Sequence, residues 1–67
     1  MVNYDPLFKT LKEKDVGKTY LRKVVDGATV AKLSKNEFVS LQTIAKICLL
    51  LDVPIEKVVK IERQFNK

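Results

Sequence analysis

The residues that most clearly suggest a binding function are the positively charged ones between positions 18 and 35. This segment contains five of them: Lys18, Arg22, Lys23, Lys32 and Lys35. Only one acid, Asp26, lies in the same stretch, so the segment carries most of the chain's net charge of +5. A local excess of positive charge in a small domain is typical of proteins that bind a polyanion, most often nucleic acid. Solvated lysines on an inert surface explain the same pattern, so charge alone leaves both interpretations open.

A short helix that begins after Asp26 would display part of this charge. Asp26 followed by Gly27 is typical of a turn and also of a helix N-cap. When Val30 and Leu33 face the core, the period of a helix directs a small, polar and cationic set of side chains outward. These outward residues are Ala28, Thr29, Lys32 and Lys35.

We interpret Ala28, Thr29 and Lys32 as residues that read DNA bases. The short side chains at Gly27, Ala28 and Thr29 would allow the backbone to approach a duplex. The amide groups at a helix N-terminus suit a phosphate. Thr29 could hydrogen-bond a base or touch a thymine methyl group, and Lys32 could reach a guanine edge. The alternative is a surface helix whose lysines are only solvated.

A second set of residues is expected to contact phosphates, which position a protein on DNA without reading its sequence. The set combines cations with residues at turns and helix starts. Its members are Lys18, Gly27, Lys35, Asn36 and Ser40.

The sequence contains few candidate residues for catalysis or for metal binding. The chain has no His, and Cys48 is its only cysteine, which excludes an internal disulfide and a cysteine-rich zinc site. The acids are scattered, so a general acid–base pair is not expected. Gly17-Lys18-Thr19 is not a phosphate-binding loop, because Lys12 stands where that motif requires glycine. The sequence predicts no enzyme, no cofactor and no metal.

Length and hydropathy predict one domain over residues 1–67 in the cytoplasm. The apolar fraction of 46% is sufficient for a single compact core. The longest unbroken apolar run, Ile47 to Leu51, is too short to span a bilayer. No signal-peptide pattern precedes Asp5 and Pro6, so we expect no membrane association.

Helical spacing recurs along the chain, whereas no stretch alternates cleanly as a strand does. Asp5 is expected to cap a first helix that has Pro6 at its first position and ends near Lys14. Gly17 is expected to precede a second helix. The core side of this second helix would contain Tyr20, Leu21, Val24 and Val25.

Two further helices are expected in the second half of the chain. Ser40 would cap a fourth helix over residues 41–51, which ends at Asp52 after a core side of Leu41, Ile44, Ile47, Cys48 and Leu51. Val53-Pro54 would break the chain before a fifth helix. That helix is marked by Ile55, Val58, Val59, Ile61 and Phe65. The sequence therefore predicts an all-α, five-helix domain.

Several segments resemble the Cro/repressor-type helix-turn-helix family, also described as XRE-like. They include Thr29-Val30-Ala31-Lys32-Leu33, Glu37-Phe38-Val39-Ser40-Leu41 and Leu51-Asp52-Val53-Pro54-Ile55-Glu56. The resemblance implies a five-helix domain whose third helix enters the major groove of double-stranded DNA. It also implies a sequence-specific transcriptional regulator, a repressor of phage or mobile-element type.

The turn between the second and third helices departs from this family's usual pattern. Eight residues separate Leu21 from Val30, fewer than family members usually have there. Either the turn is shortened to Asp26-Gly27, or the register slides so that Val25 takes the first inward position.

Apolar residues off the core side of the fourth helix suggest a contact with another protein. Ala45, Leu49 and Leu50 would form an exposed strip, which together with Phe65 predicts the interface of a homodimer. Burial of the strip under the C-terminal helix is an equal alternative. A second function is also consistent with these leucines and the short turn, namely a helix-turn-helix-derived module that binds another regulator protein as an antirepressor.

Overall fold

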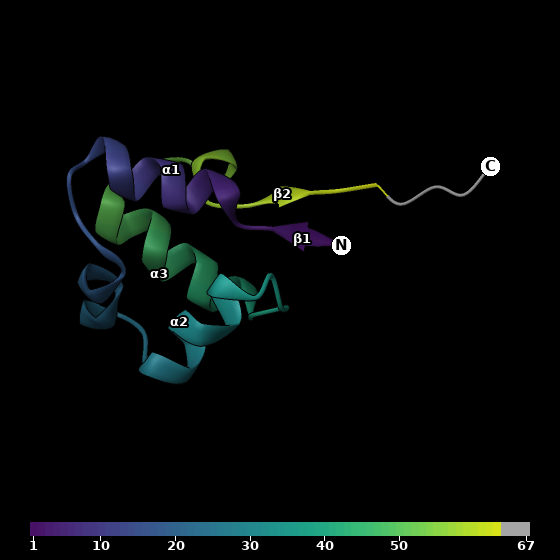
Figure 1. Ribbon diagram of the computed structural model, residues 1–67, viewed down its shortest axis with the longest axis horizontal. Coiled ribbons are helices and arrows are strands. Elements are labelled where there is room, and N and C mark those ends of the chain that lie inside the picture. The colour runs from purple at the N-terminus through teal and green to yellow at the C-terminus, as the bar shows by residue number, and fades with distance from the viewer. Residues whose placement is uncertain (64–67) are drawn as a thin grey trace.

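Three α-helices, two 3-10 helices and a two-stranded sheet make up residues 1–63, which are the residues that the computed structural model describes. Their order is β1 (Val2–Asn3), α1 (Asp5–Glu13), η1 (Lys18–Lys23), α2 (Gly27–Ser34), α3 (Leu41–Leu51), η2 (Ile55–Lys57) and β2 (Lys60–Ile61), where η denotes a 3-10 helix. In the view of Figure 1, α3 lies between α1 and α2, and the two strands project from one end of the helices.

The first helix begins one residue earlier than the sequence predicts. Tyr4 occupies the N-cap position, and Asp5 is the first helical residue rather than the cap. The side chain of Asn3 supplies an acceptor in place of a capping side chain, because its Oδ1 accepts a 2.7 Å hydrogen bond from the backbone N–H of Asp5. Lys14 is the C-cap, which confirms the predicted end of the helix.

The expected second α-helix is a 3-10 helix of six residues, η1. Gly17 is its N-cap, and Leu21 is fully buried against the core. The β-branched pair Val24 and Val25 has low helix propensity and follows directly. Both valines are half-buried against the core, and the chain leaves the helix there.

Helices α2 and α3 begin where the sequence predicts, because side chains cap them. Asp26 is the N-cap of α2. Of the two arrangements expected before this helix, the structure therefore has the turn shortened to Asp26-Gly27. The Oγ atom of Ser40 accepts a 3.1 Å hydrogen bond from the backbone N–H of Thr43 and caps α3. Asp52, in the left-handed conformation with φ of 56°, ends α3 as expected.

The expected all-α, five-helix architecture is wrong at the C-terminal end. Residues 55–61 form the short η2 and then β2, which pairs antiparallel with β1 so that Val2 faces Ile61. Val59 and Ile61 alternate with polar Lys60, a pattern that fits a strand with one apolar side. The Oγ1 of Thr10 donates a 2.7 Å hydrogen bond to the carbonyl of Lys57, which holds η2 against α1. Phe65, assigned to the fifth helix, lies outside the described residues.

The core is a single cluster of apolar side chains contributed by the helical elements and by the segments that follow β1 and η2. Its fully buried members are Tyr4, Leu7, Leu21, Leu33, Ile47 and Val58. Leu41, expected on the core side of α3, is instead 73% exposed, in the first turn of the helix, where Ser40 and Gln42 are exposed as well. Among residues 1–63, no helix is long and apolar enough to cross a bilayer.

Candidate nucleic-acid interface

The N-terminus of α2 is held in place by Asp26. The Oδ1 atom of Asp26 accepts a 2.8 Å hydrogen bond from the backbone N–H of Thr29. The carbonyl of Asp26 accepts a further bond of 3.1 Å from the N–H of Val30. Leu33 is completely buried and anchors the opposite side of the helix. The rotation of α2 about its axis is therefore fixed by its cap and by its core residue.

The residues predicted to read bases lie on the outer part of this helix. Ala28 and Lys32 are exposed and stand one helical turn apart. Thr29 is half-buried and lies beside the cap rather than at the centre of the exposed side. The structure thus brings Ala28 and Lys32 together and places Thr29 at their border.

Arg22 lies at the N-terminus of α2, a position that the sequence pattern did not indicate. A Cβ atom built on Gly27 would lie 3.3 Å from Nη1 of Arg22, so glycine lets the guanidinium approach the backbone closely. An open hollow of about 190 Å³ separates η1 from α2, and it is lined by Lys18, Thr19, Arg22, Gly27 and Val30. The guanidinium of Arg22 and the start of a helix therefore lie together at this hollow, which suits an anion.

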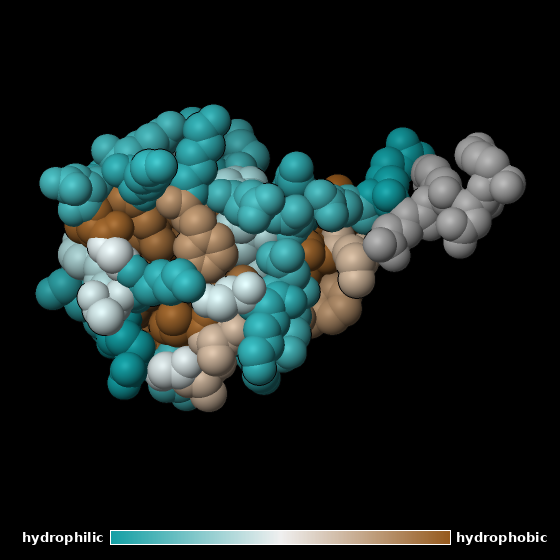
Figure 2. Space-filling view, in the orientation of Figure 1, coloured by the Kyte–Doolittle hydropathy of each residue, from teal (hydrophilic) through white to brown (hydrophobic). Residues whose placement is uncertain are grey.

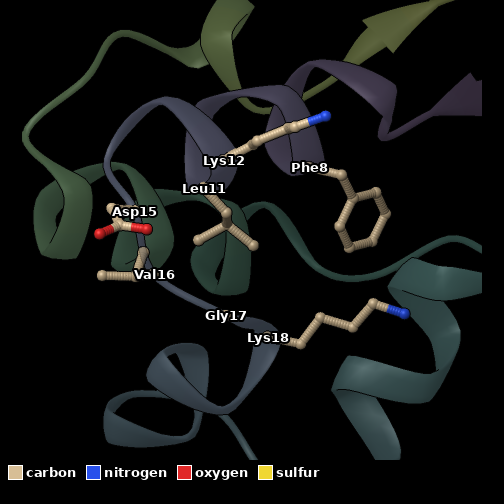
Figure 3. A pocket seen from close by; sticks show the side chains of 7 residues that line it. All are labelled: Phe8, Leu11, Lys12, Asp15, Val16, Gly17 and Lys18. Carbon is tan, nitrogen blue, oxygen red and sulfur yellow. The ribbon is translucent and has the colours of Figure 1, made fainter.

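Among the residues predicted to contact phosphates, Lys18 is the one whose position the structure defines best. Its Nζ atom donates a 3.2 Å hydrogen bond to Oγ of Ser34 in α2. The same atom lies 5.2 Å from the centre of the Phe8 ring in α1, within range of a cation–π contact. Figure 3 shows Lys18 and Phe8 on facing sides of the space below α1. The cation is exposed but held near α2.

The other predicted phosphate residues are divided between the two ends of α2. Gly27 lies at its N-terminus, whereas Lys35, Asn36 and Ser40 lie beyond its C-terminus. Asn36 has a left-handed φ of 57°, and its Oδ1 accepts a 3.0 Å bond from the N–H of Tyr4. Asn36 and Ser40 therefore hold the backbone in place, and Lys35 is the exposed cation of this group.

Hydrogen bonding lowers the pKa of Asp26 below its ordinary value. The side chain of Thr29 makes the largest contribution, followed by the backbone N–H of Thr29, and the charges of Arg22 and Lys32 add to it. Each of these favours the ionised carboxylate in the folded protein. The contribution of this group to stability is therefore present above the ordinary carboxyl pKa and is lost as pH falls through the lowered one.

Replacing Asp26 by Ala is expected to lower the free energy of unfolding at pH 7 and to matter less in acid. The variant loses the cap of α2 and the charge that Thr29 stabilises. Urea unfolding followed by circular dichroism at neutral pH and in strong acid measures the difference between wild type and variant. Glu13→Ala, which removes an exposed acid at the end of α1, controls for the loss of one charge. An equal deficit at both pH values would contradict this account.

A second hollow lies between α1 and η1 and has a volume of about 460 Å³. Its lining, shown in Figure 3, consists of Phe8, Leu11, Lys12, Asp15, Val16, Gly17 and Lys18. Figure 2 shows apolar atoms at the surface of the helical region with hydrophilic atoms around them. Asp15 is the only acid in this lining, and within residues 1–63 no three acidic, histidine or cysteine side chains gather to hold a metal ion. The hollow therefore offers packing surface rather than a catalytic set.

Two residues of the apolar strip predicted on α3 are exposed. Ala45 is exposed and Leu49 is 82% exposed, whereas Leu50 is half-buried beside Val16 and Leu51. Leu49 is therefore not buried under a C-terminal helix, which was the alternative interpretation. The sequence pattern missed Leu41, which continues the strip at a spacing of four residues. The predicted member Phe65 lies outside the described residues.

A solved structure of a transcriptional regulator is similar to this chain. The crystal structure of VanUg matches over 88% of this chain and 81% of its own, with a TM-score of 0.83 and 38% sequence identity. This chain belongs to the same family as VanUg. No protein-family profile matches the sequence, and no curated protein matches it. The helical domain with its small sheet is thus the fold of a transcriptional regulator, and the neighbour is not an enzyme.

The likeness to VanUg is consistent with the helix-turn-helix resemblance of the sequence. No profile assigns the chain to the XRE-like family, so that finer assignment is not confirmed. The expected roles of individual residues in base reading, phosphate contact and dimer formation stay predictions.

Proposed function

We propose that this protein is a sequence-specific DNA-binding transcriptional regulator that inserts α2 into the major groove. The observation that carries the proposal is the exposed pair Ala28 and Lys32 on a helix whose N-terminus adjoins the guanidinium of Arg22. The ammonium group of Lys18 lies at the other end of the same helix. A small side chain lets the helix approach base edges, and a lysine one turn further reaches guanine or a phosphate. Membership of the VanUg family supports a regulatory role.

Phosphate contacts in this proposal flank α2 at both ends. Arg22 binds one phosphate beside Gly27, together with the amide groups at the start of the helix, and Lys18 binds another near Ser34 at its end. Lys35 contacts the backbone at this second end of α2. Occupation of an operator in this way would exclude other DNA-binding proteins, so we propose repression, of phage or mobile-element type, as the mode of action.

Selection from a pool of random duplexes tests the function directly. Repeated enrichment of one short motif is the expected result, arranged as a palindrome of two half-sites when two copies bind. A pool that stays random after several rounds would exclude sequence-specific binding.

Affinity for the selected duplex is expected to fall steeply with salt. Contacts from Lys18, Arg22 and Lys35 would release counterions from about three phosphates, so the logarithmic slope should be about −3. Fluorescence anisotropy titrations between about 50 and 200 mM salt measure the slope, and the Lys35→Ala variant should lower its magnitude by about one. A slope near zero would argue against the proposed phosphate contacts.

A protein-binding function is the second candidate, because the α3 surface exposes large apolar side chains. Leu41 and Leu49 are 73% and 82% exposed and flank Ala45 along one row of the helix. Exposed apolar rows of this kind mark contacts with proteins. The partner would be another regulator protein or a second copy of this chain. A chain that enriches no duplex but binds such a partner through Leu49 would favour this function.

A further inference from the structure

The hollow between α1 and η1 has the size and the apolar floor of a small-molecule site. Its volume of about 460 Å³ lies within the range of about 300–1,000 Å³ that is typical of ligand pockets. Leu11 is a buried part of its lining, and Phe8 and Val16 are half-buried beside it. An apolar molecule placed here would cover these side chains from water. The proposed DNA contacts use only Lys18 of this lining.

Charged groups divide the rim of this hollow into a positive and a negative end. Figure 3 shows the ammonium groups of Lys12 and Lys18 on the side of the Phe8 ring. The carboxylate of Asp15 lies on the opposite side, beside Val16. An anionic group is therefore attracted to one end and repelled from the other. A matching ligand has an apolar body with a single negative charge at one end.

The two lysines at the positive end are available to such a ligand. Within residues 1–63, no acid forms an ion pair with Lys12 or Lys18. The Nζ atom of Lys18 donates a 3.2 Å hydrogen bond to the neutral hydroxyl of Ser34, and this contact is exposed. A carboxylate carries a full charge and is a stronger partner for an ammonium group than a hydroxyl is. The Lys18 side chain can therefore turn from Ser34 to a bound carboxylate.

We propose that this hollow binds a small apolar monocarboxylate, with its body on Leu11 and its carboxylate between Lys12 and Lys18. A ligand in this position takes Lys18 away from the DNA backbone and so weakens binding to the operator. Because binding free energies are coupled reciprocally, DNA weakens ligand binding by the same factor. The effect on DNA rests on the proposed function, whereas ligand binding itself does not.

Titration of the full chain with cinnamate, in the absence of DNA, tests the site. Cinnamate joins an aromatic body to one carboxylate. Heteronuclear NMR spectra are expected to show saturable shifts of the amides between Phe8 and Lys18, with a dissociation constant of about 1 mM or lower. Cinnamyl alcohol lacks the charge and acetate lacks the apolar body. Each of these is expected to bind at least about fivefold more weakly than cinnamate.

Replacing Lys12 by Ala tests the position of the carboxylate. The variant is expected to bind cinnamate about threefold more weakly than wild type, since it loses one of two exposed cations. Lys9→Ala is the matched control, because Lys9 is an exposed lysine of α1 outside the lining. The NMR spectrum of each variant also shows whether it folds. Absence of saturable shifts in wild type would overturn the site. Equal affinities of the two variants for cinnamate would overturn the place assigned to the carboxylate.

The effect on DNA is measured with the selected duplex. Saturating cinnamate is expected to weaken duplex binding about threefold to tenfold and to lower the magnitude of the salt slope by about one, because one phosphate contact is lost. Lys12→Ala should bind the duplex as wild type does and need about threefold more cinnamate for the same effect. Cinnamate that occupies the hollow and leaves duplex affinity unchanged would overturn the competition for Lys18. A pool that enriches no duplex would contradict the proposed function alone, and the NMR titration would still decide the ligand site.

Discussion

Replacing Lys32 by Ala is expected to weaken binding to the selected duplex by about tenfold or more at fixed salt. A lysine or arginine that reaches a guanine edge contributes about 1–3 kcal/mol of discrimination. The residue is exposed on α2, and its side chain takes no part in the helix cap, so the fold should survive. Anisotropy titrations measure the loss. Lys46→Ala removes an exposed charge from α3 and is the matched control.

The specificity of the Lys32 variant separates base reading from general attraction. If Lys32 reads a base, the variant should tolerate changes at one position of the motif that wild type rejects. Arg22→Ala should instead weaken binding to every duplex by a similar factor, because a phosphate contact carries no sequence information. An unchanged affinity in Lys32→Ala would remove α2 from the proposed interface.

Replacing Tyr4 by Ala is expected to remove a large share of the free energy of unfolding of the domain. The side chain is 1% exposed within the core, and its hydroxyl donates a 2.8 Å hydrogen bond to the carbonyl of Glu37. Truncating a buried aromatic residue costs about 3–5 kcal/mol. A domain of this size has a total stability of about 3–10 kcal/mol. Urea and thermal unfolding followed by circular dichroism measure the effect.

Tyr4→Phe is the matched control for the hydroxyl group. It keeps the ring and removes only the bond to Glu37, which should cost about 1 kcal/mol or somewhat more. Together with the bond from the Tyr4 backbone to the Asn36 side chain, this contact ties the segment after β1 to the loop after α2. A Tyr4→Ala protein that melts within a few degrees of wild type would contradict the central place of this residue in the core.

The boundaries of α2 and α3 could be predicted because their signals are local. Asp26 and Ser40 accept hydrogen bonds from residues three positions later, so each cap is contained within a few consecutive residues. The same local period put Leu33 inside and Lys32 outside. The most important part of the candidate interface, the outer side of α2, could therefore be predicted from the sequence.

The features that the sequence pattern missed depend on contacts between distant residues. β2 exists because Val2 and Ile61 meet, which no short window of sequence reveals, and the expected fifth helix gives way to it. Arg22 belongs to the candidate interface because η1 places it beside Gly27. Leu41 follows the helical period of a core residue yet lies outside, since burial depends on where neighbouring elements end.

Helix starts, the exposed side of α2 and the local excess of positive charge are consequences of neighbouring residues in the chain. Caps and helical period act over three or four positions, where the backbone itself sets the geometry. The choice of strand over helix near residue 60, the burial of Tyr4 and the position of Arg22 beside the start of α2 required the folded chain. These features depend on pairing and packing between segments far apart in sequence, and such energies exist only once the segments have met.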